Sequence, residues 1–132
     1  MNTSISQEQA LLDTLERFII KHVLDSSYIE IAQKWFTDLA ITILKHQESA
    51  QRPIIVGVNG CQGSGKSTLS ALLVDIINEV YNVPCIAFSI DDFYLSKQNR
   101  LNLAKNVNPL LATRGVPGTH DTLLLESVIT DL

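Results

Sequence analysis

The sequence has few cysteines and no long apolar run. It contains two cysteines, Cys61 and Cys85, in 132 residues, which is too few for a disulfide framework. No apolar stretch approaches the roughly 20 residues needed to cross a bilayer. The opening segment, MNTSISQEQ, also lacks the basic-then-apolar pattern of a secretory signal. We therefore expect a cytoplasmic protein without a membrane partner.

Clusters of basic residues are also lacking. Ten Lys and Arg residues stand against 14 Asp and Glu residues, for a net charge of −4. Since nucleic-acid phosphates are held by grouped Lys and Arg side chains, the sequence does not favour a nucleic-acid partner. The dinucleotide fingerprint G-x-G-x-x-G is absent as well, which argues against a Rossmann oxidoreductase.

The apolar pattern predicts helices at both ends and two strands in the middle. Helical spacing indicates two N-terminal helices, at about residues 6–23 and 27–45, and another at about 67–81. The segment after Leu95 is loop-like, with a short helix at 97–106 as the alternative, and the tail from 122 is a further predicted helix. The runs PIIVGV (53–58) and CIAFSI (85–90) are apolar without alternation, which is typical of strands buried on both faces.

The segment GCQGSGKST, between the first strand and the following helix, carries the strongest signal. It fits the pattern G-x-x-x-x-G-K-[ST] at every fixed position. Glycines allow a tight turn whose N–H groups point inward at an anion, and the helix start adds its positive dipole end. Lys66 would reach the β- and γ-phosphates, and the Ser67 hydroxyl would help to hold Mg²⁺. The expected ATP-binding residues are Gly60, Cys61, Gln62, Gly63, Ser64, Gly65, Lys66, Ser67 and Thr68.

Two adjacent carboxylates, Asp91 and Asp92, follow the second predicted strand in SIDDFYL. A carboxylate at the end of a parallel strand faces the ligand crevice, where it can accept a hydroxyl proton or orient Mg²⁺. One of the pair can equally cap the turn that follows. Because like charges repel, we expect the two side chains to have different roles.

A third group of polar residues lies in RGVPGTHD, residues 114–121. Arg114 can pair with a carboxylate or a phosphate, and His120 and Asp121 can bind hydroxyl groups. The alternative is a surface turn in which Asp121 caps the next helix. The segment by itself does not decide between these two interpretations.

Together, GVNGCQGSGKSTL and FSIDDFYLSKQNRLNLAKNVNPLLATRGVPGTHD resemble the D-glycerate 3-kinase family of P-loop kinases. Uridine kinases, phosphoribulokinases and bacterial pantothenate kinases are similar but more distant. The resemblance is close over residues 53–121. It implies ATP-dependent phosphorylation of a small hydroxy acid, with D-glycerate converted to 3-phosphoglycerate.

The resemblance also implies residue roles. Lys66 and Asp91 would be catalytic, with Asp91 receiving the hydroxyl proton and, with Ser67, serving the metal. The acceptor pocket would be lined by Asp92, Tyr94, Arg100, Arg114, His120 and Asp121. ATP and Mg²⁺ would be the cofactors, with Arg114 facing the substrate carboxylate.

Members of the resembled family are about twice as long as this chain. The implied fold is α/β: an incomplete P-loop NTPase-type parallel sheet with flanking helices, preceded by two N-terminal helices. We divide it into an N-terminal helical segment (1–50) and the N-terminal part of a kinase domain (51–132). In that fold class a further strand separates the two strands predicted here, so neither can pair with the other.

Three interpretations follow. The chain is the N-terminal piece of a kinase, with little activity alone and a C-terminal half supplied as a separate chain. Alternatively it is a catalytically competent minimal kinase, alone or completed by another chain. A uridine- or pantothenate-type kinase is the alternative to a D-glycerate kinase. In the third interpretation it is a nucleotide-binding or regulatory module that binds ATP without transferring phosphate.

Overall fold

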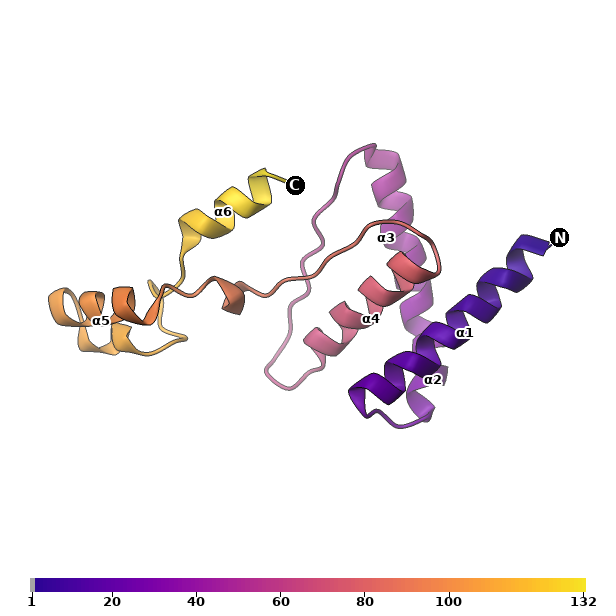
Figure 1. The fold of residues 1–132 in the computed structure, drawn as a ribbon, viewed down its shortest axis with the longest axis horizontal. Coiled ribbons are helices and arrows are strands. Elements are labelled where there is room, and N and C mark those ends of the chain that lie inside the picture. The colour runs from indigo at the N-terminus through magenta and orange to yellow at the C-terminus, as the bar shows by residue number, and fades with distance from the viewer. Residues whose placement is uncertain (1) are drawn as a thin grey trace. The chain divides into compact units, whose positions relative to one another are not determined.

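The computed structural model describes residues 2–132, with side chains from residue 6 onward. The chain divides into two compact units, one ending at Ala87 and the other spanning Phe88–Leu132. The first unit contains α1 (Asn2–His22), α2 (Ser27–Ile31), the π-helical turn η1 (Ala32–Phe36), α3 (Thr37–Ala50) and α4 (Lys66–Glu79) (Figure 1). The second contains the 3₁₀ turns η2 (Ile90–Phe93) and η3 (Pro109–Ala112) with α5 (Lys97–Asn106) and α6 (Thr122–Thr130).

The predicted α/β fold class is wrong for this structure. Residues 2–132 contain no sheet: both predicted strands, 53–58 and 85–90, lie mostly in backbone without regular secondary structure, and 90 begins η2. Within this described range, the one β-type pairing is an isolated antiparallel bridge between Tyr94 and His120. The predicted helices, by contrast, are present, and the second of them contains the π-helical turn η1.

The two predicted strands fail for lack of a partner. A strand is stabilised by a ladder of backbone hydrogen bonds to a neighbour, and the backbone of 53–59 makes none with any described residue. Several of their apolar side chains accordingly stay in solvent, with Ile55 63% and Ile86 69% exposed, while Cys85 packs partly against the core. The sequence pattern correctly indicates that these segments are apolar. It does not indicate that residues 2–132 supply no neighbouring strand for them.

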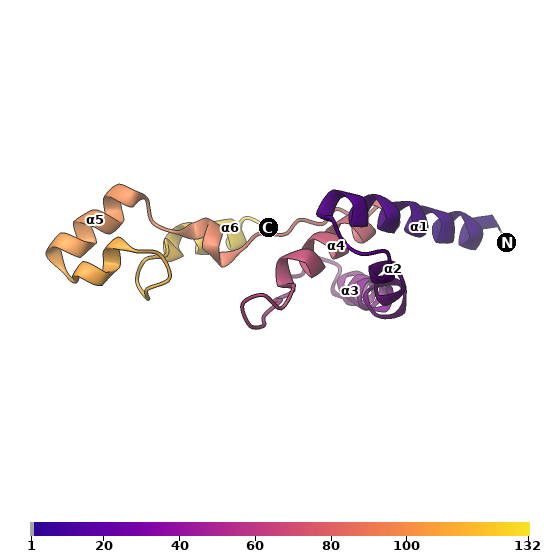
Figure 2. The same ribbon diagram turned by 90° about the horizontal axis from the view of Figure 1, so that it is seen from below.

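The apolar core of the first unit forms around α4. Leu72 and Ile76 of α4 are fully buried, since residues four apart lie on one face of a helix. They belong to one cluster with Leu15 and Phe18 of α1 and with Ala40 of α3. Figures 1 and 2 show α4 beside both of these helices. The helix that begins at Lys66 is therefore fixed by the best-packed part of the unit.

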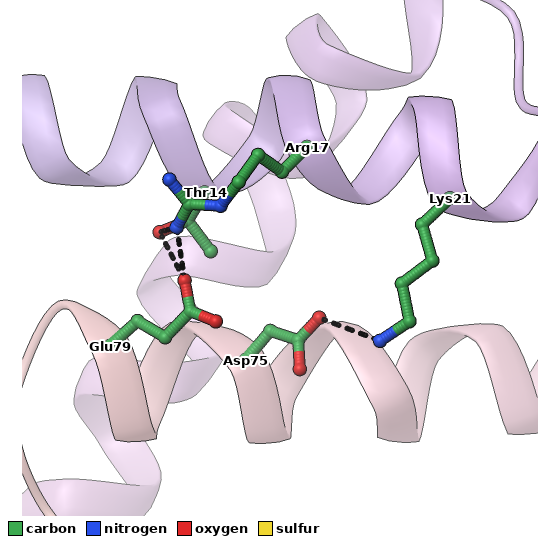
Figure 3. Close-up of polar contacts among 5 residues, drawn as sticks. All are labelled: Thr14, Arg17, Lys21, Asp75 and Glu79. Atoms are coloured by element: carbon green, nitrogen blue, oxygen red, sulfur yellow. Dashed lines mark hydrogen bonds and ion pairs between the residues drawn. The ribbon is translucent and has the colours of Figure 1, made fainter.

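A polar border joins α1 to α4 beside this core (Figure 3). The guanidinium of Arg17 pairs with the Glu79 carboxylate, which also accepts a hydrogen bond from the hydroxyl of the buried Thr14 (3.2 Å). One turn along, Lys21 Nζ lies 3.8 Å from Asp75 Oδ2. The basic side chains come from α1 and the acidic ones from α4, so the charges favour this pairing of helices.

None of the helices in residues 2–132 is both long enough and apolar enough to span a membrane. The division into 1–50 and 51–132 made from the sequence stays a prediction. It separates α1, α2, η1 and α3 from everything that follows.

The core predicts a large effect of truncating Ile76. We expect Ile76→Ala to lower the free energy of unfolding by about 2–5 kcal/mol, because a fully buried side chain leaves a cavity. The matched control is Ile20→Ala on α1, where the side chain is 77% exposed and the change should be within about 0.5 kcal/mol. Urea denaturation followed by circular dichroism measures both. Equal effects of the two substitutions would contradict the described core.

The polar border predicts a small effect. In a double-mutant cycle of Arg17→Met and Glu79→Gln, we expect a coupling of about 0–1 kcal/mol, because the two side chains are 62% and 45% exposed and water screens them. The coupling should shrink further in 1 M NaCl. A coupling above about 2 kcal/mol, or one insensitive to salt, would mean that this contact is more buried than described.

Candidate functional site

The glycine loop of the first unit adopts the conformation that its sequence requires. Gly63 and Gly65 have φ of +78° and +84°, values that other residues adopt only with strain. At Gly60 an added Cβ would lie 2.9 Å from the Ser64 hydroxyl oxygen, so a side chain there would require the Ser64 hydroxyl to move. The turn is closed by the Ser64 N–H, which donates to the Cys61 carbonyl (3.2 Å).

Lys66 lies across this loop. Its Nζ donates to the carbonyls of Gly60 and Cys61, at 2.8 Å each, so the ammonium group is held at the loop by the loop's own backbone. No Asp or Glu oxygen of the described residues lies within ion-pair distance of it. The charge is therefore available to an anion at this position.

The start of α4 adds a second feature that suits an anion. Its N-cap residue is Gly65, and no side chain accepts a hydrogen bond from the first turn. Unpaired N–H groups at a helix N-terminus attract anions, phosphates above all. Ser67, in this first turn, is exposed and Thr68 is half-buried. The loop, the ammonium group and the helix start therefore lie together, and their predicted role in binding phosphate groups stays a prediction.

The second unit brings three of the predicted acceptor residues together with the predicted catalytic residue Asp91. The Tyr94 and His120 rings stack with centroids 4.1 Å apart, and the Arg114 guanidinium carbon lies 5.4 Å from the Tyr94 centroid. His120 Nε2 lies 3.8 Å from Asp91 Oδ1, too far for a hydrogen bond. That nitrogen is buried and has no hydrogen-bond partner among the described residues. A carboxylate, a guanidinium, an imidazole and a phenol thus share one small region.

The backbone of this cluster is fixed by a short antiparallel pairing. The Leu95 N–H donates to the Thr119 carbonyl (2.9 Å) and the Asp121 N–H donates to the Phe93 carbonyl (2.6 Å). Tyr94 and His120 lie opposite each other between these two bonds, which explains their stacked rings. Thr119 is fully buried and its hydroxyl donates to Val116 O (2.6 Å). Apart from its place after a glycine, no sequence feature of Thr119 predicted this burial.

Asp91 and Asp92 have different surroundings, as expected for adjacent like charges. Asp92 Oδ2 accepts from the Ser89 N–H (2.8 Å) while the Ser89 hydroxyl accepts from the Asp91 N–H (3.1 Å), which is a capping box on η2. The spacing S-x-x-D was the signal for this cap. Asp91 makes no such bond, and its side chain is 76% exposed on the side of His120.

The two remaining predicted pocket residues make structural contacts. Asp121 is the N-cap of α6 and accepts from the Leu124 N–H (3.0 Å), the alternative that the sequence left open. Arg100 is buried, and its guanidinium donates to the carbonyls of Leu95 and Ala112. Neither contact tests a role in substrate binding, so those roles stay predictions.

The Tyr94 phenol is perturbed by its neighbours. Loss of solvent raises the pKa of Tyr94 above its ordinary value, and the hydrogen bonding and charge of Asp91 raise it further, while the Gly115 backbone and the Arg114 charge act in the opposite direction. The phenol therefore stays protonated at neutral pH and remains a donor.

Among the described residues, no three His, Cys, Asp or Glu side chains gather in a group that could hold a metal ion.

A glycine loop of this geometry is typical of proteins that bind nucleotide phosphates. The chain is 44% identical over 96 residues to the uncharacterized kinase mug58 of Schizosaccharomyces pombe, covering 70% of this chain and 34% of that protein. It is 40% identical over 84 residues to the "Probable ATP-dependent kinase TDA10" of Saccharomyces cerevisiae, covering 61% and 29%. A pantothenate kinase of Bacillus velezensis is 30% identical over 89 residues, covering 67% and 27%.

Over these partial lengths the chain is homologous to P-loop kinases, and it is related to ATP-dependent kinases of the uridine and pantothenate kinase group. It spans about a third of the length of the curated relatives it matches first. No family model and no solved structure matches the chain. None of these relatives is named as a glycerate kinase.

The cluster predicts a shift in the titration of Tyr94. We expect Asp91→Asn to lower the pKa of Tyr94, because the substitution removes the charge that favours the neutral phenol. In the unsubstituted chain the stability contributed by the neutral phenol is present below pH 10 and is lost as the pH rises through the raised pKa. Residue-resolved NMR titration is needed because Tyr28 and Tyr81 also have raised pKa values.

Asp131→Asn, at an exposed acid just after α6, is the control for this titration. It should leave the Tyr94 pKa unchanged. An unchanged Tyr94 pKa in Asp91→Asn would show that Asp91 does not face the phenol.

Proposed function

We propose that this chain carries the nucleotide loop and the acceptor site of a kinase that transfers the γ-phosphoryl group of MgATP to a hydroxyl of a small hydroxy acid, D-glycerate. The observation that carries the proposal is the cluster of Asp91, Tyr94, Arg114 and His120 in a chain that also holds the glycine loop. The kinase relatives support the nucleotide. The cluster supports the acceptor.

At the nucleotide end, residues 60–68 supply what a triphosphate needs. Backbone N–H groups of the loop and of the first α4 turn would bind the phosphate oxygens, and Lys66 would leave one of its carbonyl partners to reach the β- and γ-phosphates. The Ser67 hydroxyl is the proposed Mg²⁺ ligand of this unit, and the ion would supply neutralisation of the phosphate charge; the metal role of Asp91 stays a prediction.

At the acceptor end, Arg114 is the proposed partner of the substrate carboxylate. A guanidinium binds a carboxylate through two parallel N–H bonds, and the Tyr94 face holds this one by a cation–π contact. His120, whose buried Nε2 has no partner among the described residues, would bind an acceptor hydroxyl. Such a site selects a small molecule with a carboxylate at one end and a hydroxyl at the other.

The transfer needs little covalent chemistry from the protein. The acceptor hydroxyl oxygen forms a bond to the γ-phosphorus, its proton passes to Asp91, and the bond from the γ-phosphorus to the bridging oxygen breaks to release ADP. Asp91 is suited to this because its carboxylate is not used by the η2 cap. The proposed location is the cytoplasm, where the two free cysteines stay reduced.

Pantothenate is a second candidate acceptor. The relation to a pantothenate kinase over 67% of this chain favours it. Pantothenate also carries both a carboxylate and a hydroxyl, so Arg114 would serve either substrate. Uridine has no carboxylate and would leave Arg114 without a partner.

The test measures binding at each end separately. We expect Lys66→Ala to weaken ATP binding tenfold or more, because an ammonium contact to the phosphates is lost, and to leave D-glycerate binding unchanged. We expect Arg114→Met to weaken D-glycerate binding and to leave ATP binding unchanged. Isothermal titration calorimetry of the full chain measures its affinity for ATP, D-glycerate, pantothenate and uridine. Transfer of the phosphoryl group is followed by ³¹P NMR, and we expect Asp91→Asn to abolish it.

Lys105→Ala, at an exposed residue of α5, and Asp131→Asn are the matched controls and should bind both ligands normally. ATP binding that survives Lys66→Ala would contradict the nucleotide site. Tight ATP binding with no acceptor bound would favour a nucleotide-binding module instead. Preference for pantothenate would replace D-glycerate as the acceptor.

A further inference from the structure

Arg100 is the only charged residue that is buried among residues 6–132, with 8% of its surface exposed. A buried charge is costly unless it is paired or well hydrogen-bonded. No Asp or Glu oxygen of the described residues lies within ion-pair distance of its guanidinium. The charge is instead compensated by backbone carbonyl dipoles, so its burial calls for a reason beyond pairing.

The guanidinium joins two segments that are separate in the sequence. Its Nη1 donates to the Leu95 carbonyl and its Nε lies 3.5 Å from the Ala112 carbonyl, while Arg100 itself is in the first half of α5. One planar fork can hold two acceptors at a fixed spacing, which a lysine ammonium on a flexible stem does not do. Arg100 therefore sets the distance between residues 95 and 112.

Those two segments carry Tyr94 and Arg114, two residues of the proposed acceptor site. Leu95 follows Tyr94 directly and is held from its other side by Thr119, through its N–H (2.9 Å). Ala112 ends η3, two residues before Arg114. The contact between Tyr94 and Arg114 at 5.4 Å thus joins the same two segments that the guanidinium of Arg100 joins through their backbones.

We propose that Arg100 is a positioning residue: it fixes the Tyr94 and Arg114 segments so that Arg114 presents its fork to the acceptor carboxylate. This role rests on the proposed acceptor site. It replaces the direct substrate contact that the resemblance implied for Arg100. Arg100 acts through the backbone on residues that bind the acceptor, and the nucleotide loop, which belongs to the other unit, does not depend on it.

The experiment compares Arg100→Lys and Arg100→Gln with Lys105→Gln, an exposed basic residue of the same helix, in the full chain. Two readouts are measured at a temperature where each variant is folded by circular dichroism. The first is the NMR cross-relaxation between the Tyr94 ring and the Arg114 side chain, with that between the Tyr94 and His120 rings as an internal reference. The second is affinity for D-glycerate and ATP by titration.

We expect both Arg100 variants to lose the Tyr94–Arg114 contact and to bind D-glycerate at least tenfold more weakly, with ATP affinity unchanged. The Tyr94–His120 contact should persist, because the bonds of Leu95 and Asp121 hold it independently. Lys105→Gln should change nothing. A role confined to folding would instead lower the stability and leave both readouts normal in the folded fraction.

Two results would overturn the proposal. The first is a Tyr94–Arg114 contact that survives in both Arg100 variants. The second is D-glycerate binding that is lost in them while this contact is kept, which would indicate a direct substrate contact. If the unsubstituted chain does not bind D-glycerate, the proposed acceptor is wrong, and the Tyr94–Arg114 contact still decides whether Arg100 positions that pair.

Discussion

The contact between α4 and its two neighbouring helices is the interaction on which the position of the glycine loop depends. Each fully buried aliphatic side chain contributes about 1.5–3 kcal/mol, and Leu72 and Ile76 both lie in this contact. The loop ends where α4 begins, at Lys66, while the segment before it, 53–59, has no backbone hydrogen bond to hold it. Among the described residues the loop is therefore anchored from its C-terminal side, by a helix whose own position is set by burial.

The helices could be predicted from the sequence and the sheet could not, and the reason is the range of the interactions involved. A helix satisfies its backbone within four residues, so an apolar stripe such as Leu11, Leu15 and Phe18 is sufficient to indicate it. A strand needs a neighbour whose identity its own sequence does not contain. Ile55 and Ile86 have the composition of buried strands, and both are exposed, because no neighbour is present among residues 2–132.

The candidate site divides along the same line. The glycine loop could be predicted because its constraints are local: Gly63 and Gly65 need positive φ, and the helix start follows at once. The sequence also indicated that Asp91 and Asp92 would differ, and the S-x-x-D spacing from Ser89 to Asp92 is a local signal for the cap of η2. The approach of His120 to Asp91 joins residues far apart in the sequence, so it could not be predicted from a local pattern. The burial of Arg100 could not be predicted either, because a charged residue on a short polar helix is ordinarily exposed.

The two halves of the proposed site have in common that each is built from contacts within its own unit. The glycine loop is formed by residues 60–68 and the helix that follows them. The cluster of Tyr94, Arg114 and His120 depends on the backbone pairing of Leu95 with Thr119 and on the guanidinium of Arg100. Neither set uses a sheet hydrogen bond. This explains how a chain without a sheet among its described residues can hold both arrangements. It also separates two questions that are usually joined in a kinase: the residues proposed to bind each ligand belong to one unit, whereas the proposed transfer involves residues of both units.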